Sequence, residues 1–198
     1  MSVRHFYFYV ILIIGVIIMR VSEFTNIDNT FNEAMFLTKV NNIFIKFFTS
    51  IMTDKLADVD HFIGDDVYNY GENILNKVRS KNYRQMYDEL NVKNSRISNI
   101  EVTDNEYIID VYLESRYMDY IIDLNTGNVV SGNDSSRVQV NYNLRFVKNV
   151  CVHEQGIARK CPSCGAPMNV NKSGKCDYCG GIYNQEDYDY VLTSITVC

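Results

Sequence analysis

The spacing of apolar residues changes along the chain, and each spacing predicts a different kind of segment. The first segment, residues 6–19 (FYFYVILIIGVIIM), is an uninterrupted apolar run between Arg4 and Arg20. A helix over this run would span only about 21 Å, but a helix over residues 3–21 would span about 28 Å, close to the roughly 30 Å hydrocarbon core of a bilayer. Since the two arginine side chains can extend to the interfaces, the pattern predicts an N-terminal transmembrane helix.

Two other interpretations of this run compete with the membrane anchor. A cleaved signal peptide also has a short charged start and an apolar stretch of this length, but the residues that follow, 20–28 (RVSEFTNID), contain no small-x-small cleavage site. A buried core helix is the third interpretation, although the run lacks the polar face that such helices normally show. The sequence therefore favours the anchor.

Apolar residues then recur at three- and four-residue spacing, which predicts helices. The positions in the first of them are Phe31, Met35, Val40, Ile43, Phe44, Phe47, Ile51 and Met52. Asn29 or Thr30 together with Glu33 fits a capping box at its start. A second helix is expected from about Asp65, with acidic residues first and basic residues last. A short further turn of helix is expected at 83–90.

From residue 92 the spacing changes to two, which predicts strands. Residues 107–114 alternate between apolar and polar, and 138–146 do so cleanly enough to predict a half-buried antiparallel strand. Turn signals at 104–105 (DN) and 125–128 (NTGN) separate these runs. The segment 97–146 is therefore expected to form a meander of three or four strands, and helices followed by a sheet predict an α+β domain.

A last strand is expected close to the C-terminus. Residues 188–197 (YDYVLTSITV) are rich in β-branched and aromatic side chains and too hydrophobic for a free tail. The economical arrangement pairs this strand with 138–147. The segment between the two strands then becomes an insertion in one domain.

Composition limits the possible classes of protein. The 198 residues suffice for one ordinary domain and a small additional unit. Hydrophobic residues make up 46% and charged residues 22%, which is typical of a folded globular chain. The net charge of −5 argues against a nucleic-acid-binding protein, whose phosphate contacts need a basic face.

The strongest chemical signal is a pair of Cys-x-x-Cys-Gly motifs. Cys161 and Cys164 form the first, and Cys176 and Cys179 form the second after an eleven-residue spacer. Four thiolates at this spacing are the ligand set of a zinc ribbon, so the sequence predicts one zinc ion. Because four cysteines leave no open coordination position, the zinc is expected to be structural. Two disulfides or a redox pair are the alternatives.

All six cysteines lie at or after Cys151, so residues 1–150 fold without disulfides. Cys151, His153 and Cys198 could form a second site, but their separations match no ligand pattern and favour two incidental thiols and a surface histidine. A reduced four-thiolate site prefers a reducing compartment. This places the part after the anchor on the cytoplasmic side of the membrane.

Several segments taken together resemble a known family. They are 31–52 (FNEAMFLTKVNNIFIKFFTSIM), 118–132 (MDYIIDLNTGNVVSG), 140–148 (VNYNLRFVK), the CPSCGAP and GKCDYCG motifs, and 187–195 (DYDYVLTSI). The combination is similar to the bacterial zinc-ribbon branch of the Tim-forty-four-like domain family, named for a mitochondrial inner-membrane translocase subunit. One departure is Tyr190, where the closing strand of the family usually carries Trp.

The resemblance implies a fold and a division of the chain. The fold would be a nuclear-transport-factor-two-like (cystatin-like) cone, with helices on a curved antiparallel sheet and an apolar pocket between them. The expected parts are a transmembrane anchor at 1–24, an α+β domain at 25–150 and 186–198, and an inserted zinc ribbon at 151–185. We therefore expect a single-pass cell-membrane protein with its C-terminal domain in the cytoplasm.

Three functions are compatible with these features. The favoured one is a membrane-tethered, non-catalytic binding or scaffold module that contacts membrane lipid and another membrane or cytoplasmic protein, with a possible link to protein transport. The second is an enzyme with acid–base residues in the cone, for which the candidates are His61, Asp119, Tyr120 and Tyr142. An inward-facing carboxylate in an apolar pocket would favour this enzyme. The third is a nucleic-acid-binding zinc ribbon, for which residues 151–182 carry too little positive charge.

Overall fold

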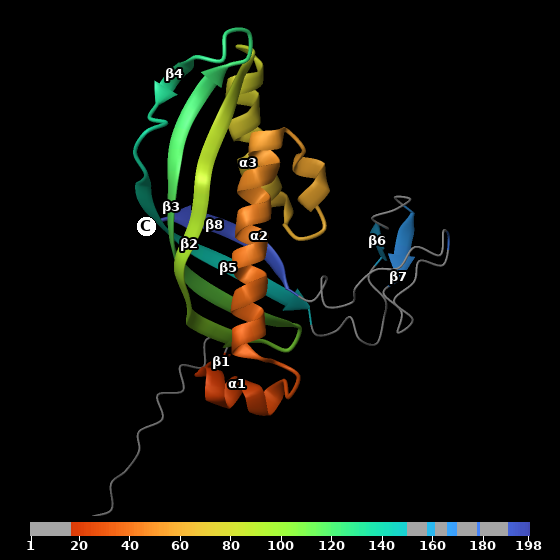
Figure 1. Cartoon of the computed structure of the whole chain (residues 1–198). Coiled ribbons are helices and arrows are strands. Elements are labelled where there is room, and N and C mark those ends of the chain that lie inside the picture. Colours follow the sequence, from red (N-terminus) through yellow and green to blue (C-terminus); the bar gives the residue numbers. More distant parts are fainter. Residues whose placement is uncertain (1–16, 150–157, 161–165, 170–177, 179–189) are drawn as a thin grey trace, which may run out of the picture.

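Two long strands, β2 and β3, form the centre of a curled antiparallel sheet that wraps around helix α2 (Figure 1). The computed structural model describes residues 17–149, 158–160, 166–169, 178 and 190–198. The strands of the sheet are β1 (Ile17–Ile18), β2 (Tyr83–Val102), β3 (Glu106–Asp123), β4 (Val129–Gly132), β5 (Val138–Asn149) and β8 (Val191–Val197). Their order is β1-β2-β3-β5-β8, and β4 pairs with β3.

The helices precede the long strands in the chain. They are α1 (Val21–Ile27), α2 (Glu33–Thr53), the 3-10 helix η1 (Leu56–Val59) and α3 (Asp65–Arg79). The α+β class and the two principal helices are therefore as the spacing predicts. A curled antiparallel sheet with helices packed on it is also what a cone fold requires.

Helix α2 forms because its apolar residues lie on one face and are buried there. Phe44, Phe47 and Ile51 are fully buried in this face. The cap differs from the predicted one: Asn32 is the N-cap, and its side chain accepts a hydrogen bond from the backbone nitrogen of Met35 at 3.0 Å. An Asn at this position satisfies one of the free N–H groups of the first turn, so the helix begins after Asn29 and Thr30.

Residues 83–90 form the first half of β2, so the predicted turn of helix is wrong. Gln85 and Tyr87 are buried at alternate positions and face the core, while their neighbours are more exposed. The segment pairs with the second half of β3, with Tyr83 opposite Asp123. A short run of mixed residues fits both a helical and a strand spacing, and here pairing with β3 decides between them.

Irregularities in β2 give the sheet its curvature. The register between β2 and β3 shifts between Asp88 and Asn91, and it shifts at two further points along β2. Glu89 has a φ of 54° at the first shift. Bulges of this kind bend a strand and increase its twist, which lets β2 and β3 curl over the helix instead of lying flat.

The closing strand confirms the predicted pairing. Strand β8 runs antiparallel to β5, with Tyr142 opposite Val197 and Val147 opposite Val191. Residues 150–189 therefore leave the sheet at the end of β5 and return to it at the start of β8. Leu192 and Phe146 lie opposite each other in these two strands, and both are fully buried.

The chain enters the domain earlier than the predicted anchor boundary at residue 24. Ile17 and Ile18 pair with Val102 and Glu101 as strand β1. Phe24 of α1 is fully buried, and its ring lies 5.0 Å from that of Tyr107. Residues 17–24 thus belong to the folded domain, and the rest of the predicted anchor, 1–16, lies outside the described residues. Within the described ranges, each helix is too short or too polar to cross a bilayer.

Two glycines with positive φ, Gly127 in the β3–β4 turn and Gly132 at the end of β4, allow a test of this hairpin. Gly132 has φ +80°, and a Cβ there would lie 2.6 Å from the Cα of Tyr120, whereas Gly127 has φ +72° and open space around it. Gly127→Ala should lower the free energy of unfolding by about 1 kcal/mol through backbone strain alone. Gly132→Ala should lower it clearly more, because backbone atoms must also move. Urea unfolding of both variants measures the difference, and equal effects would contradict the packing described for Gly132.

Candidate functional site

The four candidate acid–base residues do not come together in the structure. Asp119 and Tyr142 lie on the helix-facing side of β3 and β5. Tyr120 points to the other side of the sheet, where its hydroxyl donates a hydrogen bond to the carboxylate of Asp88. His61 lies in the connection between η1 and α3, with its ring against that of Phe62 at 3.8 Å between centroids. The sequence candidates therefore form no shared site.

Asp119 lies near the end of β3, on the side of the sheet that faces the helices. The amide nitrogen of Gln85 donates a hydrogen bond to its Oδ1 at 2.8 Å. Burial nevertheless raises the pKa of Asp119, and this hydrogen bond only partly offsets the effect. Its side chain is still exposed to solvent at the rim. It is thus a perturbed carboxyl group, but it does not lie at the bottom of an apolar pocket.

Aromatic side chains fill the interior in which an apolar pocket was expected. The ring of Phe48 lies 5.7 Å from that of Tyr142 and 4.8 Å from that of Tyr87, both edge to face. The hydroxyls of Tyr117 and Tyr142 are 2.6 Å apart and hydrogen-bonded. Burial raises the pKa of Tyr117 to about 12 and that of Tyr142 further. These phenols stay protonated at neutral pH, so they serve packing and not proton abstraction.

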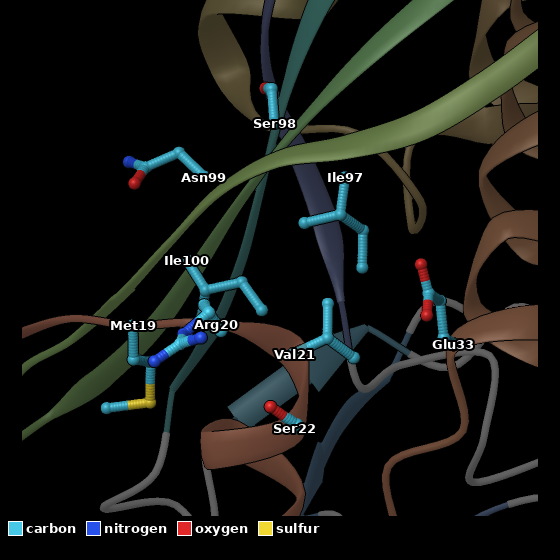
Figure 2. Close-up of a pocket in the computed structure, with 9 residues that line it drawn as sticks. All are labelled: Met19, Arg20, Val21, Ser22, Glu33, Ile97, Ser98, Asn99 and Ile100. Carbon is cyan, nitrogen blue, oxygen red and sulfur yellow. The ribbon is translucent and has the colours of Figure 1, made fainter.

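Hollows of substantial size open on the outside of the domain instead. One of about 600 Å³ lies where the N-terminal segment meets β2. Figure 2 shows Val21, Ile97 and Glu33 around this hollow, from α1, β2 and α2 respectively. Helix α1 is capped at its start by Glu23. The Arg20 backbone nitrogen donates a hydrogen bond of 2.9 Å to a carboxylate oxygen of this residue. The hollow therefore lies directly beside the point where the chain enters the domain.

The same end of the molecule exposes several large apolar side chains. Strand β1, helix α1 and the start of α2 lie together there (Figure 1). Ile17 is 61% exposed, Ile18 72% and Met35 63%, and Ile27 is also exposed. Exposed apolar side chains that gather in one region typically mark contact with a membrane or another protein. We call these four residues the entry patch.

A second hollow, of about 420 Å³, runs along the outer side of α2. Its apolar floor includes Phe31, Phe36 and Tyr190. Lysines from two elements, Lys39 and Lys46 of α2 and Lys148 of β5, line it as well. We call this hollow the lysine groove, and the described residues that line it are Asp28, Thr30, Phe31, Asn32, Met35, Phe36, Thr38, Lys39, Asn42, Ile43, Lys46, Phe62, Lys148 and Tyr190.

Asp28 is the carboxylate among these lining residues. Its Oδ2 lies 3.1 Å from the Lys148 ammonium group, and both side chains are about nine-tenths buried. Burial raises the pKa of Asp28, but hydrogen bonds from Thr30 and Lys148 and the positive charge of Lys148 outweigh it and leave the pKa lowered. The pair is therefore ionised at neutral pH. The apolar spacing of the sequence does not predict this groove, but Lys39 and Lys46, which are two turns apart on α2, could have indicated it.

The predicted zinc ligands Cys161, Cys164, Cys176 and Cys179 lie outside the described residues, as do Cys151 and His153. Cys198 is described and is an exposed free thiol. Within the described ranges, no group of three or more His, Cys, Asp or Glu is arranged to hold a metal ion. Strands β6 (Ala158–Lys160) and β7 (Pro167–Asn169) pair antiparallel, with Lys160 opposite Pro167. In the sequence, the first cysteine motif lies between these two strands.

The raised pKa of Asp119 predicts a specific pH dependence of stability. A folded protein that favours the protonated carboxyl loses stability as the pH rises from the ordinary pKa of aspartate towards the raised value. Asp119→Asn should remove part of this loss in urea unfolding measured across acidic pH. Asp110 is the control: burial raises its pKa, but Arg145 and Asn99 outweigh this and lower it. Asp110→Asn should therefore reduce stability at neutral pH, and the same sign for both variants would contradict the assignment.

Comparison with known proteins places the chain at the level of a family. The model of the Tim44-like domain matches residues 19–156, which is more than half of the chain. A search of curated proteins found no match. The match begins after β1 and includes α1, α2, α3 and the strands from β2 to β5. The zinc-ribbon branch and a bacterial origin stay predictions from the sequence. The chain belongs to the Tim44-like domain family.

Proposed function

We propose that this protein is a membrane-tethered, non-catalytic binding or scaffold module that acts at the cytoplasmic face of the cell membrane. The observation that carries the proposal is the entry patch: Ile17 and Ile18 are exposed and belong to the last part of the apolar N-terminal run. The domain would then meet the membrane with the end at which its chain begins. Membership of the Tim44-like family supports membrane association.

The start of the domain determines how the tether can enter the membrane. Met19 donates a backbone hydrogen bond to the Ile100 carbonyl at 3.1 Å, which continues the pairing of β1 with β2. A helix over residues 3–16 would reach about 21 Å, whereas a full crossing needs roughly 20 residues. A single-pass span would therefore include residues that here form β1. We propose that residues 3–16 insert and that Ile17 and Ile18 lie at the interface.

The distribution of the acid–base candidates supports a module without catalytic activity. Asp119 and Tyr120 lie on opposite faces of the sheet, and Tyr142 is engaged with Tyr117. The entry patch and the lysine groove offer contact surfaces for lipid and for a partner protein. A role in protein transport rests on the family alone, and family membership is weaker support for a function than a site is.

We also propose that the insertion between β5 and β8 contains one structural zinc bound by Cys161, Cys164, Cys176 and Cys179. The pairing of β6 with β7 supports this, because it brings together the residues that flank Cys161 and Cys164 in the chain. The metal would supply much of the folding free energy of a segment with few apolar side chains. Its role would be structural, since four thiolates complete its coordination.

The tether predicts how the full-length protein behaves in membrane fractionation. The wild type should stay in the membrane pellet after a carbonate wash. Val10→Asp together with Ile11→Asp should release it, because an aspartate near the centre of an inserted helix costs about 3 kcal/mol. Val129→Asp with Val130→Asp, on the exposed strand β4, is the matched control and should stay in the pellet. A wild type in the supernatant would refute the tether.

Protease added outside intact cells should leave the domain uncut, and cleavage there would reverse the topology.

The zinc proposal predicts about one zinc per chain by elemental analysis of purified protein. Cys161→Ser or Cys179→Ser should abolish binding, because three thiolates no longer complete the tetrahedral set. Cys198→Ser, which removes the exposed thiol of the described part, is the control and should retain the full content. Full zinc content in both ligand variants would eliminate this four-cysteine assignment.

A further inference from the structure

The lysine groove lies where the 150–189 insertion leaves and rejoins the domain. Lys148 is the penultimate residue of β5, and Tyr190 directly precedes β8. Both residues line the groove, and Val147 opposite Val191 holds their strands together. The end of β5 and the start of β8 lie beside α2 in Figure 1. Any residue close to Tyr190 in the chain is therefore close to the groove in space.

The residues that precede Tyr190 are strongly acidic. The segment 186–189 (EDYD) contains three carboxylates, and residues 183–198 contain no lysine or arginine. Consecutive Cα atoms lie 3.8 Å apart, so Asp189 begins next to the groove and Glu186 lies within roughly 14 Å of Tyr190. This reach is comparable to the roughly 10 Å rise between Lys39 and Lys46 on α2.

The charges of the groove complement this segment. Among the described residues of the lining, Lys39, Lys46 and Lys148 stand against one carboxylate, that of Asp28. Asp28 pairs with Lys148, and the Lys46 ammonium lies 4.6 Å from the centre of the Phe62 ring. The aromatic floor would also receive a tyrosine side chain. A segment with three carboxylates and one aromatic ring matches a groove with lysines above an aromatic floor.

We propose that the acidic segment 186–189 of the same chain occupies the lysine groove, with its carboxylates at Lys39 and Lys46 and Tyr188 on the apolar floor. Covalent attachment next to the groove gives the segment a high effective concentration, so modest ion pairs suffice to hold it. The consequence would be to limit how far the predicted zinc ribbon can move from α2, because Cys179 lies seven residues before Glu186. An acidic partner protein would have to displace the segment.

Zero-length carbodiimide crosslinking of the full-length protein tests this proposal. The reagent joins a carboxylate to an amine that it already contacts. Mass spectrometry should find peptides that join 186–189 to Lys39 or Lys46. The Asp28–Lys148 pair, 3.1 Å apart, is the internal positive control. Crosslinks at Asp28–Lys148 without any between 186–189 and the two α2 lysines would overturn the proposal.

Variants and labelling separate the possible occupants. Glu186→Gln with Asp187→Asn and Asp189→Asn should remove the crosslinks to α2 and leave Asp28–Lys148 intact. A mixture of isotopically light and heavy chains should give crosslinks within one chain only, and mixed crosslinks would assign the groove to a second copy. Crosslinks from Lys39 or Lys46 to other acidic residues of the insertion, or only to another protein in membranes, would likewise refute occupation by 186–189.

A charge exchange provides a second measurement that does not depend on the reagent. Glu186→Lys with Asp187→Lys should lower the midpoint of urea unfolding, and this effect should weaken in high salt because the pairs are screened. Adding Lys39→Glu and Lys46→Glu should restore the midpoint at least in part. Independent, additive effects of the two double substitutions would contradict contact between the segment and the groove.

Discussion

Phe44 and Phe48 of α2 meet Tyr142 of the sheet in edge-to-face contacts, and the rest of the fold depends on this aromatic layer. Each buried aromatic ring contributes about 1.5–3 kcal/mol through the area it removes from water. A flat sheet could contact a helix along one line only, so the bulges of β2 are needed to bring β2, β3 and β5 around α2. The hydroxyls of Tyr117 and Tyr142 satisfy each other inside this layer.

Because aromatic side chains fill the interior, the surfaces that are open to a partner lie on the outside of the domain. A cone that held an empty apolar cavity could take a ligand between helix and sheet, but here side chains of the protein occupy that space. What the fold offers instead is its entry end, with Ile17 and Ile18 exposed, and the outer side of α2 with its lysines. Both surfaces lie next to segments that join the domain to something else, the N-terminal run and the insertion.

Periodicity predicted most elements correctly because burial of one face sets both spacing and structure. Helix α2 and the pairing of β8 with β5 follow from regular apolar stripes. The first half of β2 was missed because its pattern is short and its partner, the second half of β3, lies far along the chain. The lysine groove was missed for a related reason. Lys39 and Lys148 are distant in sequence, and only the packing of α2 beside β5 places them on one surface.

The paired stem of the insertion has a consequence for how the chain folds. Since Val147 and Val191 are held opposite each other, the long segment between them is a closed loop whose ends the sheet already fixes. The entropy of closing such a loop grows only slowly with its length, by about 0.6 kcal/mol for each doubling. The sheet therefore tolerates large changes in the length of this loop. Evolution can lengthen, replace or remove that loop without redesigning the core, and the domain can form before the loop adopts its own structure.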